Sequence, residues 1–321
     1  MTAKKVLVIG GGAWGSAISC LLADNNCQVT LNSNEEKVIL EINKKSINSK
    51  YLPNIALNKK IKASLDYNLN ADFVFIVVPS AVSKEVFTKI KNTKFKKDVI
   101  FVILSKGIEG SSLKLLSDVF EEITKIKNYA ILSGPNFAVE VAQKIPSITT
   151  VASKNKVLAQ KVIKILNNKY FQAHYSQDVE AAEICGVVKN IMAIACGMVD
   201  GLSLGVNTKA GVVVKGVKEI ELICKKLKKG YDLANGAGFG DIFLTCSSAK
   251  SRNNSLGYAI ANGKKYDKNK TYEGQVAAKL ITQLAKKLKI RLDLCACVEE
   301  ILRGNFSQKQ IKEKIISAIL K

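Results

Sequence analysis

Three segments of the chain carry residues whose types and spacing could do chemistry. The first is a glycine-rich run that follows four apolar residues and opens a helical pattern, Gly10-Gly11-Gly12-Ala13-Trp14-Gly15. In such a turn the first glycine permits the tight bend, the second lets the backbone approach a pyrophosphate, and the third lets the helix pack on the strand. The amides at the start of the helix then bind the phosphates. The run predicts a dinucleotide site, and the alternative is a tight turn without a ligand.

The residues after the next apolar strand bear on which dinucleotide binds. An acidic residue at the end of that strand would bind an unphosphorylated ribose, and a nearby arginine would accommodate a 2′-phosphate. The chain has neither at that point and continues as Asn32-Ser33-Asn34-Glu35-Glu36. The first three side chains can hydrogen-bond either form of the ribose, and Lys37 can assist a phosphate. NAD and NADP are therefore both compatible with these residues.

The second segment is an apolar helical pattern that contains one charge. Between Ile184 and Val199 only Lys189 is charged. Burying a lysine without a partner costs free energy, and burial lowers its pKa, which suits a proton donor or acceptor near neutral pH. Asn190 follows it and can orient a substrate hydroxyl. The alternative is a lysine at a helix edge whose ammonium reaches solvent.

The third segment joins a glycine-rich turn at residues 236–240 to a group of polar residues. They follow in the order Asp241, Thr245, Ser251, Arg252 and Asn253. A hydroxyl, an amide and a forked guanidinium at the start of a helix, which we expect from Ser255 onward, can form an anion site. Only three of the 49 basic residues are arginines, so an arginine at this place favours a need for its fork geometry. The alternative is a capped helix start without a ligand.

These segments need a scaffold, and the hydrophobic pattern predicts two parts. The first half alternates helical patterns with short apolar runs that indicate strands, at residues 6–9, 28–31, 73–78, 99–104, 130–132, 148–152 and 170–173. Continuous apolar strands separated by helices predict a parallel sheet covered on both faces. From about Val179 the pattern is helical. We therefore predict an α/β fold with a Rossmann-like dinucleotide-binding domain over residues 1–178 and an all-helical substrate and catalytic domain over residues 179–321.

The composition limits the function classes. The net charge is +22, but the lysines are scattered and no basic run alternates with aromatic residues. This favours a solvated surface with an attractive field for anionic substrates over a nucleic-acid site. The eight cysteines have no C-x-x-C spacing, and the lone His174 has no cysteine near it in sequence. We expect buried free thiols in a reducing cytoplasm, and neither a structural zinc site nor a disulfide framework.

The apolar segments are also informative about membranes. The run near the N-terminus is too short for the core of a signal peptide. No stretch reaches roughly 18–20 uncharged apolar residues, so no membrane-spanning segment is predicted. The longest candidate, residues 184–199, is interrupted by Lys189.

Taken together, the motifs resemble the bacterial-type NAD(P)-dependent glycerol-3-phosphate dehydrogenases over nearly the whole chain. The glycine loop with Trp14 matches, and shorter runs follow in family order at residues 51–53, 77–80, 105–109, 251–253 and 273–274. The most specific matches are Leu132-Ser133-Gly134-Pro135-Asn136-Phe137-Ala138-x-Glu140, Val188-Lys189-Asn190-Ile191-x-Ala193-Ile194 and Gly240-Asp241-x-x-x-Thr245-Cys246-Ser247.

The resemblance implies an enzyme that reversibly reduces dihydroxyacetone phosphate to sn-glycerol 3-phosphate with NADH or NADPH and so supplies glycerophospholipid synthesis. It implies a cytoplasmic homodimer without nucleic-acid binding or membrane insertion. Lys189 would be the catalytic proton donor and acceptor. The substrate site would be lined by Lys106, Gly134, Asn136, Asn190, Asp241, Thr245, Ser251, Arg252 and Asn253. The cofactor would contact Gly10, Gly12, Ala13, Trp14, Gly15, Asn34, Lys106, Ala138, Arg252, Thr271 and Glu273.

The chain departs from the family pattern at a few positions. Asn32 and Asn34 stand where the family often has Trp and Arg or His. Asn136 replaces a usual Ser or Thr, and Lys215 replaces a usual Arg. A proline that the family has near Leu294 is missing.

Two rival functions make different predictions. The first rival is another two-domain dehydrogenase, of the 3-hydroxyacyl-CoA or 6-phosphogluconate type. The hydroxyacyl-CoA type requires a catalytic histidine, and His174 lies outside the segment around Lys189. A basic nucleic-acid-binding protein is the second. It would bind with strong salt dependence, and it gives no reason for a lysine inside an apolar helix.

Overall fold

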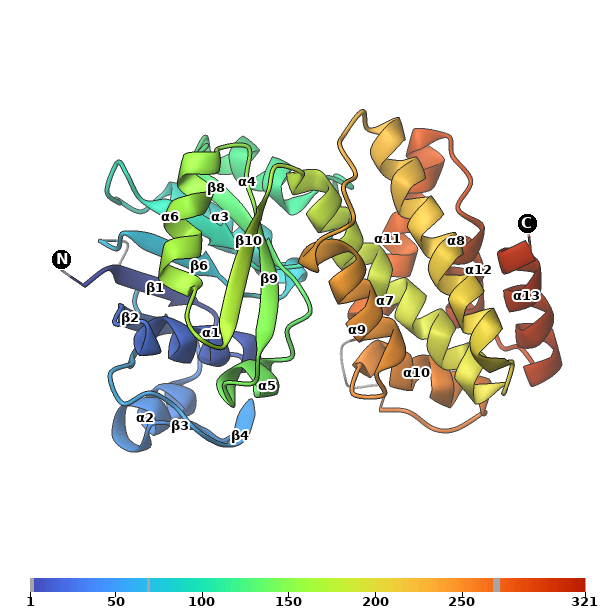
Figure 1. Ribbon diagram of the computed structural model, residues 1–321, viewed down its shortest axis with the longest axis horizontal. Helices are drawn as coiled ribbons and strands as arrows, with labels where there is room; N and C mark the ends of the chain where they lie inside the picture. Colours follow the sequence, from blue (N-terminus) through green and yellow to red (C-terminus); the bar gives the residue numbers. More distant parts are fainter. Residues whose placement is uncertain (1–2, 68–69, 268–271, 321) are drawn as a thin grey trace. The chain divides into compact units, whose positions relative to one another are not determined.

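The chain folds into two compact units (Figure 1). The computed structural model describes residues 3–67, 70–267 and 272–320. The first unit comprises Met1–Lys106 and Leu116–Val179, and the second comprises Gly107–Leu115 and Glu180–Lys321. Gly107–Leu115 belongs with the second unit because Ile108 and Leu115 are buried in its hydrophobic core. The predicted single boundary after residue 178 assigns Gly107–Leu115 to the first unit instead.

The first unit is built on an eight-stranded sheet with the strand order β10-β9-β8-β7-β6-β1-β2-β5. Of its neighbouring pairs, β8 and β9 run antiparallel and the others run parallel. The strands are β1 (Lys5–Ile9), β2 (Gln28–Asn32), β5 (Lys62–Ser64), β6 (Phe73–Ile76), β7 (Ile100–Ile103), β8 (Tyr129–Ser133), β9 (Ser147–Ala152) and β10 (Phe171–Ser176).

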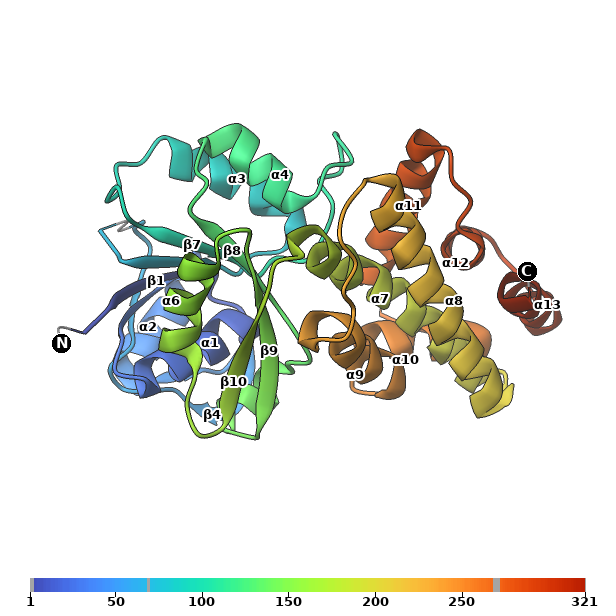
Figure 2. The same cartoon turned by 45° about the horizontal axis from the view of Figure 1, so that its top comes forward.

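Helices cover both faces of this sheet, with α1 and α6 on one face and α3 and α4 on the other (Figure 2). Successive side chains of a strand point to opposite faces. In β7, Val102 therefore lies in the core that includes residues of α1 and α6, whereas the ring of Phe101 lies 5.3 Å from that of Phe120 in α4. The elements are α1 (Ala13–Asp24), α2 (Glu36–Lys45), α3 (Ser80–Lys91), α4 (Leu116–Thr124), α5 (Ala138–Ala142) and α6 (Lys156–Leu166), with a hairpin of β3 (Ile47–Asn48) and β4 (Leu52–Ala56) after α2.

The predicted α/β fold is confirmed, and the ends of the predicted strands shift by at most three residues. The prediction of a wholly parallel sheet is wrong at one place. The connection from β8 to β9 holds only the five-residue helix α5, which is too little for a helical crossover, so β9 returns antiparallel. The strand β5 was missed because its only buried residue is Ala63, which makes no apolar run.

The second unit is helical and is organised around α7 (Val179–Gly201), which runs among the other helices (Figure 1). By length and composition α7 could cross a membrane, with a mean hydropathy of 1.6 over its most apolar stretch, but all of that stretch is buried inside the protein. A helix that is apolar and covered on every side is a core helix. It is followed by α8 (Gly205–Lys226), the π-helical turn η1 (Gly236–Gly240), α9 (Asp241–Ser247), α10 (Arg252–Ala261), α11 (Glu273–Leu288), α12 (Asp293–Arg303) and α13 (Gln308–Leu320).

Helix α12 is capped by a residue of another helix, because a leucine stands at its own N-cap position. The carboxylate of Glu219 in α8 accepts hydrogen bonds from the amides of Leu294, at 2.6 Å, and Cys295, at 3.1 Å. Glu219 is 3% exposed, and burial raises its pKa above the ordinary value. One turn earlier on α8, Lys215 pairs with Asp293 at 3.0 Å. These contacts fix α12 to α8.

The eight cysteines are buried and free, as predicted. Burial raises the pKa of Cys20 and Cys27 to about 11, so these thiols remain protonated at neutral pH. Within the described ranges, no group of three or more His, Cys, Asp or Glu side chains is arranged to hold a metal ion.

Replacing Glu219 by alanine tests the cap on α12. We expect Glu219→Ala to lower the free energy of unfolding by about 2–3 kcal/mol, because two amides at the helix start lose their acceptor. The matched control is Glu221→Ala on the same helix, whose carboxylate lies 3.9 Å from the ammonium of Lys225. That loss should stay below about 0.5 kcal/mol. Equal losses in urea denaturation would contradict the capping role.

Candidate active site

The parallel strands bring the loops that follow them to one edge of the sheet. β1, β2, β6, β7 and β8 run in the same direction, so their carboxyl ends meet at that edge. In open α/β sheets ligands bind at this edge. The structure thereby brings the glycine loop after β1 together with Asn34 after β2, Lys106 after β7 and Gly134 after β8.

The glycine loop has the geometry that a dinucleotide requires. Gly10 has a φ of +121°, and a Cβ there would lie 2.2 Å from the carbonyl oxygen of Val77. A Cβ on Gly15 would lie 1.8 Å from the carbonyl oxygen of Gly10, so only glycine lets α1 pack this closely. Gly12 differs, because its Cβ position faces open space, with nothing within 4 Å apart from its neighbours along the chain, and no side chain caps the start of α1. Uncapped helix amides beside open space suit a pyrophosphate, so these residues fit a nicotinamide dinucleotide.

A residue outside the predicted site supports the glycine loop. Asn48 of β3 is fully buried, and its amide nitrogen donates to the carbonyl oxygen of Gly11 at 2.9 Å and to the hydroxyl of Ser16 at 2.8 Å. Its Oδ1 accepts from the amide of Tyr51 at 3.3 Å. Sequence reasoning missed Asn48 because its partners in the loop lie 37 and 32 residues away and no local pattern marks it.

The residues after β2 divide into structural ones and one accessible one. Asn32 is buried, and its amide donates to a carbonyl oxygen beyond β5 at 2.8 Å. The carboxylate of Glu35 accepts hydrogen bonds from Lys50 and Tyr51, which lower its pKa. Asn34 lies between Asn32 and Glu35 in the sequence and is exposed. It is uncharged, so it fits the ribose of NAD and that of NADP.

The loop after β8 is closely packed. A Cβ on Gly134 would lie 2.8 Å from the Cα of Thr149, so glycine is required there. The Nδ2 of Asn136 donates to the carbonyl oxygen of Ile148 at 2.9 Å. Ala138, half-buried, begins α5, as Ala13 and Trp14 begin α1.

Lys189 is buried in the middle of α7 and is held by two side chains of α9. Its Nζ donates to Asp241 Oδ1 at 2.7 Å and to Thr245 Oγ1 at 3.0 Å. Lys189 is 7% exposed and Asp241 is 1% exposed. The alternative of an ammonium that reaches solvent at the helix edge is therefore wrong. A buried ammonium in a direct ion pair, oriented by a hydroxyl, has the chemistry of a positioned proton donor.

The glycine-rich turn explains how Asp241 reaches the lysine. In η1, Gly238 has φ −86° and ψ −111°, which interrupts the helical path. A Cβ on Gly238 would lie 2.2 Å from the carbonyl oxygen of Leu233, and the side chain of Asn235 accepts from the Gly238 amide at 3.0 Å. The tight turn ends where Asp241 becomes the first residue of α9. The glycines thus serve to place a carboxylate.

Helix α10 begins at Arg252, so the predicted start at Ser255 is wrong. Ser251 caps the helix, since its Oγ accepts from the amide of Asn254 at 3.4 Å. The Arg252 side chain is exposed and makes no hydrogen bond or ion pair within the part of the chain that the structure describes. The other two arginines both pair with carboxylates. The start of α10 therefore combines a capped helix with a guanidinium that is available for an anion.

Three further predicted residues join the helices at this place. The Nδ2 of Asn190 in α7 lies 3.4 Å from Glu273 Oε2 at the start of α11. Asn253 Oδ1 accepts from the amide of Gly274 at 3.1 Å. Thr271, a predicted cofactor residue, lies outside the described residues.

Backbone contact holds α10 against α7. A Cβ on Gly197 would lie 1.9 Å from the carbonyl oxygen of Asn254, and one on Gly257 would lie 1.9 Å from that of Ile194. Any side chain at either glycine would separate the helices. Because Lys189 lies about two turns before Gly197 on α7, this contact fixes the start of α10 relative to the lysine.

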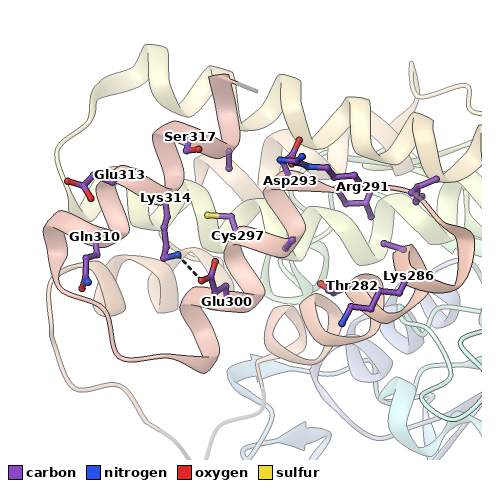
Figure 3. Close-up of a pocket in the computed structure, with 15 residues that line it drawn as sticks. Thr282, Lys286, Arg291, Asp293, Cys297, Glu300, Gln310, Glu313, Lys314 and Ser317 are labelled. Atoms are coloured by element: carbon purple, nitrogen blue, oxygen red, sulfur yellow. Dashed lines mark hydrogen bonds and ion pairs between the residues drawn. The ribbon is translucent and has the colours of Figure 1, made fainter.

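A cavity of about 660 Å³ lies elsewhere in the second unit, between α11, α12 and α13 (Figure 3). Its lining contains none of the predicted site residues. Two ion pairs lie in its lining, between Lys314 and Glu300 at 2.7 Å and between Arg291 and Asp293. A charged ligand in this cavity would compete with these ion pairs.

The fold and these residues define a class of protein. A Rossmann-like sheet with a dinucleotide loop, joined in one chain to a helical unit with a buried lysine–aspartate pair, is a nicotinamide-dependent dehydrogenase. Family models described as the N-terminus and the C-terminus of NAD-dependent glycerol-3-phosphate dehydrogenase match residues 5–159 and 178–313. The chain belongs to this family.

Individual relatives match most or all of the chain. Glycerol-3-phosphate dehydrogenase (NAD(P)+) of Neorickettsia sennetsu is 38% identical over 289 residues, which cover 89% of this chain and 86% of the relative. The protein of the same name from Caulobacter vibrioides is 35% identical over 329 residues, covering 100% and 99%. The crystal structure of glycerol-3-phosphate dehydrogenase from Coxiella burnetii has a TM-score of 0.91 at 30% identity and covers 98% of this chain and 99% of that one.

The ion pair of Lys189 can be tested through stability. We expect Asp241→Asn to lower the free energy of unfolding by about 3–5 kcal/mol, because it leaves a buried ammonium without a counter-charge. The control Asp200→Asn removes the partner of Lys209 in a partly exposed pair and should cost less than about 1 kcal/mol. The double variant Lys189→Met/Asp241→Leu should recover most of the loss. A denaturation midpoint for Asp241→Asn equal to that of the control would rule out a buried pair.

Proposed function

We propose that this chain reversibly reduces dihydroxyacetone phosphate to sn-glycerol 3-phosphate with NADH or NADPH. The observation that carries the proposal is the buried cluster of Lys189, Asp241 and Thr245 in a chain of this family. Reduction of a ketone requires a proton donor fixed beside the carbonyl oxygen. An ammonium held by two partners in an apolar surrounding meets that requirement. The relatives described above carry glycerol-3-phosphate in their names.

Each residue of the cluster has a role in the reaction. Lys189 donates a proton to the carbonyl oxygen during reduction and accepts it back in the reverse direction. Asp241 and Thr245 hold the ammonium in one direction, so no reorganisation is needed when negative charge develops on that oxygen. When bound, the nicotinamide cofactor supplies the hydride.

The phosphate of the substrate is bound at the start of α10. The exposed guanidinium of Arg252 can form two parallel hydrogen bonds to phosphate oxygens, and the helix start adds a positive dipole. Binding energy from this remote group positions the reacting carbon. Six further residues line the substrate, namely Lys106, Gly134, Asn136, Asn190, Ser251 and Asn253.

The cofactor is bound by the first unit through its pyrophosphate. Gly10, Gly12 and Gly15 shape the loop, and the amides of Ala13 and Trp14 at the start of α1 bind the phosphates. Asn34 hydrogen-bonds the ribose of either cofactor. The remaining contacts to the cofactor come from Lys106, Ala138, Arg252, Thr271 and Glu273.

In the cell the reaction would supply the glycerol phosphate backbone of phospholipids. The protein would act in the cytoplasm as a homodimer, without nucleic-acid binding or membrane insertion. The net charge of +22 supports an anionic small substrate, because a scattered excess of lysine attracts anions without forming a nucleic-acid groove. We assign the cofactor mainly to residues 1–178, and substrate binding and catalysis mainly to residues 179–321.

One assay tests the reaction and the role of Lys189 together. NADH and NADPH oxidation are followed separately with dihydroxyacetone phosphate, and wild-type turnover is expected with at least one of them. Lys189→Met should lower kcat by about 10³-fold or more, because the proton donor is lost, while cofactor binding measured by fluorescence is retained. The control Lys209→Met should keep wild-type turnover. A wild-type protein inactive with both cofactors overturns the function, and substantial turnover by Lys189→Met overturns the role.

The phosphate site is tested at Arg252. We expect Arg252→Ala to raise the KM for dihydroxyacetone phosphate by about 30- to 100-fold and to lower kcat much less, because a charge-assisted bond to the substrate is lost. Arg303→Ala is the matched control, since that arginine already faces Glu299. An unchanged KM in Arg252→Ala would exclude the assignment.

A further inference from the structure

One fully buried polar side chain beside the glycine loop has no role in the proposed reaction, namely Asn48 of the hairpin β3–β4. Its Nδ2 donates to the carbonyl oxygen of Gly11 at 2.9 Å and to Ser16 Oγ at 2.8 Å. Its Oδ1 accepts from the amide of Tyr51 at 3.3 Å. Both N–H groups of the side chain are used within the protein and no part of it is exposed, so Asn48 can act on a ligand only through its neighbours.

The orientation of the Asn48 amide follows from its main-chain partners. A carbonyl oxygen can only accept and a main-chain N–H can only donate. The nitrogen of the side chain therefore faces Gly11, and the oxygen faces Tyr51. Gly11 lies 37 residues before Asn48 and Tyr51 lies 3 residues after it, so this side chain ties the glycine loop to the hairpin.

The hydrogen bond from Asn48 sets the direction of one peptide group in the glycine loop. None of the described peptide bonds is cis, and in a trans peptide the C=O and the N–H point to opposite sides. Because the carbonyl oxygen of Gly11 faces the buried Asn48, the N–H of Gly12 points away from it. This N–H has no hydrogen-bond partner among the described residues. The loop thus presents a donor that no protein group uses.

Without this bond the same peptide group could turn over. It joins two glycines, and residues without a Cβ have the widest choice of φ and ψ. Gly12 adds no constraint, because its Cβ position faces open space. A peptide that has turned over presents the carbonyl oxygen of Gly11 in place of the N–H. Since successive N–H groups attract an anion and a carbonyl oxygen repels it, this orientation decides how well the loop binds a phosphate.

We propose that Asn48 is a positioning residue for the cofactor, which directs the Gly12 N–H to the pyrophosphate by holding the carbonyl oxygen of Gly11. Asn48 itself does not touch the cofactor. The inference rests on the proposed function and deepens it, because it adds a buried residue that acts on the cofactor only through the glycine loop. It also explains the residue type, since one amide supplies the donor for Gly11 and the acceptor for Tyr51.

Replacing Asn48 by aspartate reverses the sign of the interaction. The carboxylate keeps the shape of the side chain and the acceptor for Tyr51, but it has no donor for the carbonyl oxygen of Gly11. It repels that oxygen and attracts the N–H of Gly12, so we expect the peptide to turn over in Asn48→Asp. By calorimetry the Kd for NADH should rise at least about 100-fold, and the Kd for ADP-ribose, which carries the pyrophosphate but no nicotinamide, should rise equally. NADPH and 2′-phospho-ADP-ribose are used if NADPH binds more tightly.

The variant Asn48→Ala removes the bond without adding a charge. Both orientations of the peptide are then populated, and the cofactor binds only the fraction with the N–H directed outward. We expect the Kd for NADH to rise about tenfold. At saturating NADH, kcat should stay within about twofold of the wild type, because the bound cofactor selects the competent orientation. General unfolding would instead reduce the amount of active enzyme and lower the apparent kcat.

Two matched controls separate this role from stability. Asn25 lies at the other end of α1, and its amide donates to two carbonyl oxygens at the end of α6, both at 2.9 Å. Asn25→Ala should lower the melting temperature and bind NADH as the wild type does. Ser16→Ala removes one acceptor of Asn48 but leaves the bond to Gly11, so its Kd for NADH should change less than about threefold.

Three outcomes would overturn the positioning role. The first is an unchanged Kd for NADH in a folded Asn48→Asp; if that variant does not fold, an unchanged Kd in Asn48→Ala has the same meaning. The second is equal weakening in Asn48→Ala and Asn25→Ala, which would mean a general effect of the stability of α1. The third is a weakening for NADH but not for ADP-ribose, which would locate the effect at the nicotinamide. These binding measurements require no turnover, so they are independent of a failed assay with dihydroxyacetone phosphate.

Discussion

The helical unit depends on one interaction, the ion pair between Lys189 and Asp241 inside an apolar core. An ammonium in such surroundings costs several kcal/mol unless a counter-charge lies in direct contact. Asp241 meets this condition at 2.7 Å, and Thr245 adds a hydrogen bond at 3.0 Å. The position of α9 follows, because its first residue must face the middle of α7. The glycines of η1 are required for the same reason, because only a turn this tight places the Asp241 carboxylate at that position.

The remaining helices are fixed with similar strictness around α7. Gly197 and Gly257 bring α10 into backbone contact with it, and Glu219 binds the start of α12 to α8. Such contacts leave little freedom to the helices around Lys189. A catalytic group needs this rigidity, since a proton donor displaced by about 1 Å loses much of its effect. The close packing of the helices around α7 thus fixes the positions of a few polar side chains.

In the first unit, by contrast, the loops at the carboxyl edge of the sheet leave open space. Glycines close the loop after β1 where the backbone is crowded and leave Gly12 facing open space. Asn48 donates a hydrogen bond to the carbonyl oxygen of Gly11 in this loop, whereas Ser133 Oγ and Asn136 Oδ1 have no hydrogen-bond partner among the described residues. Stability is best served by satisfied polar atoms, so these two atoms are exceptions among the described residues.

The sequence by itself determined the features that are local along the chain. A glycine run between a strand and a helix, a single charge in an apolar helix and the change from alternating to helical patterning all depend on near neighbours, and they predicted the fold class and most of the candidate site. Only the tertiary structure decided which distant residues meet. Lys189 and Asp241 are 52 residues apart, Glu219 caps a helix 75 residues later, and Asn48 supports a loop 37 residues earlier. The antiparallel return of β9 and the start of α10 at Arg252 were also decided there. Such contacts depend on how whole elements pack, and local propensity carries no information about the partner that a side chain finds across the fold.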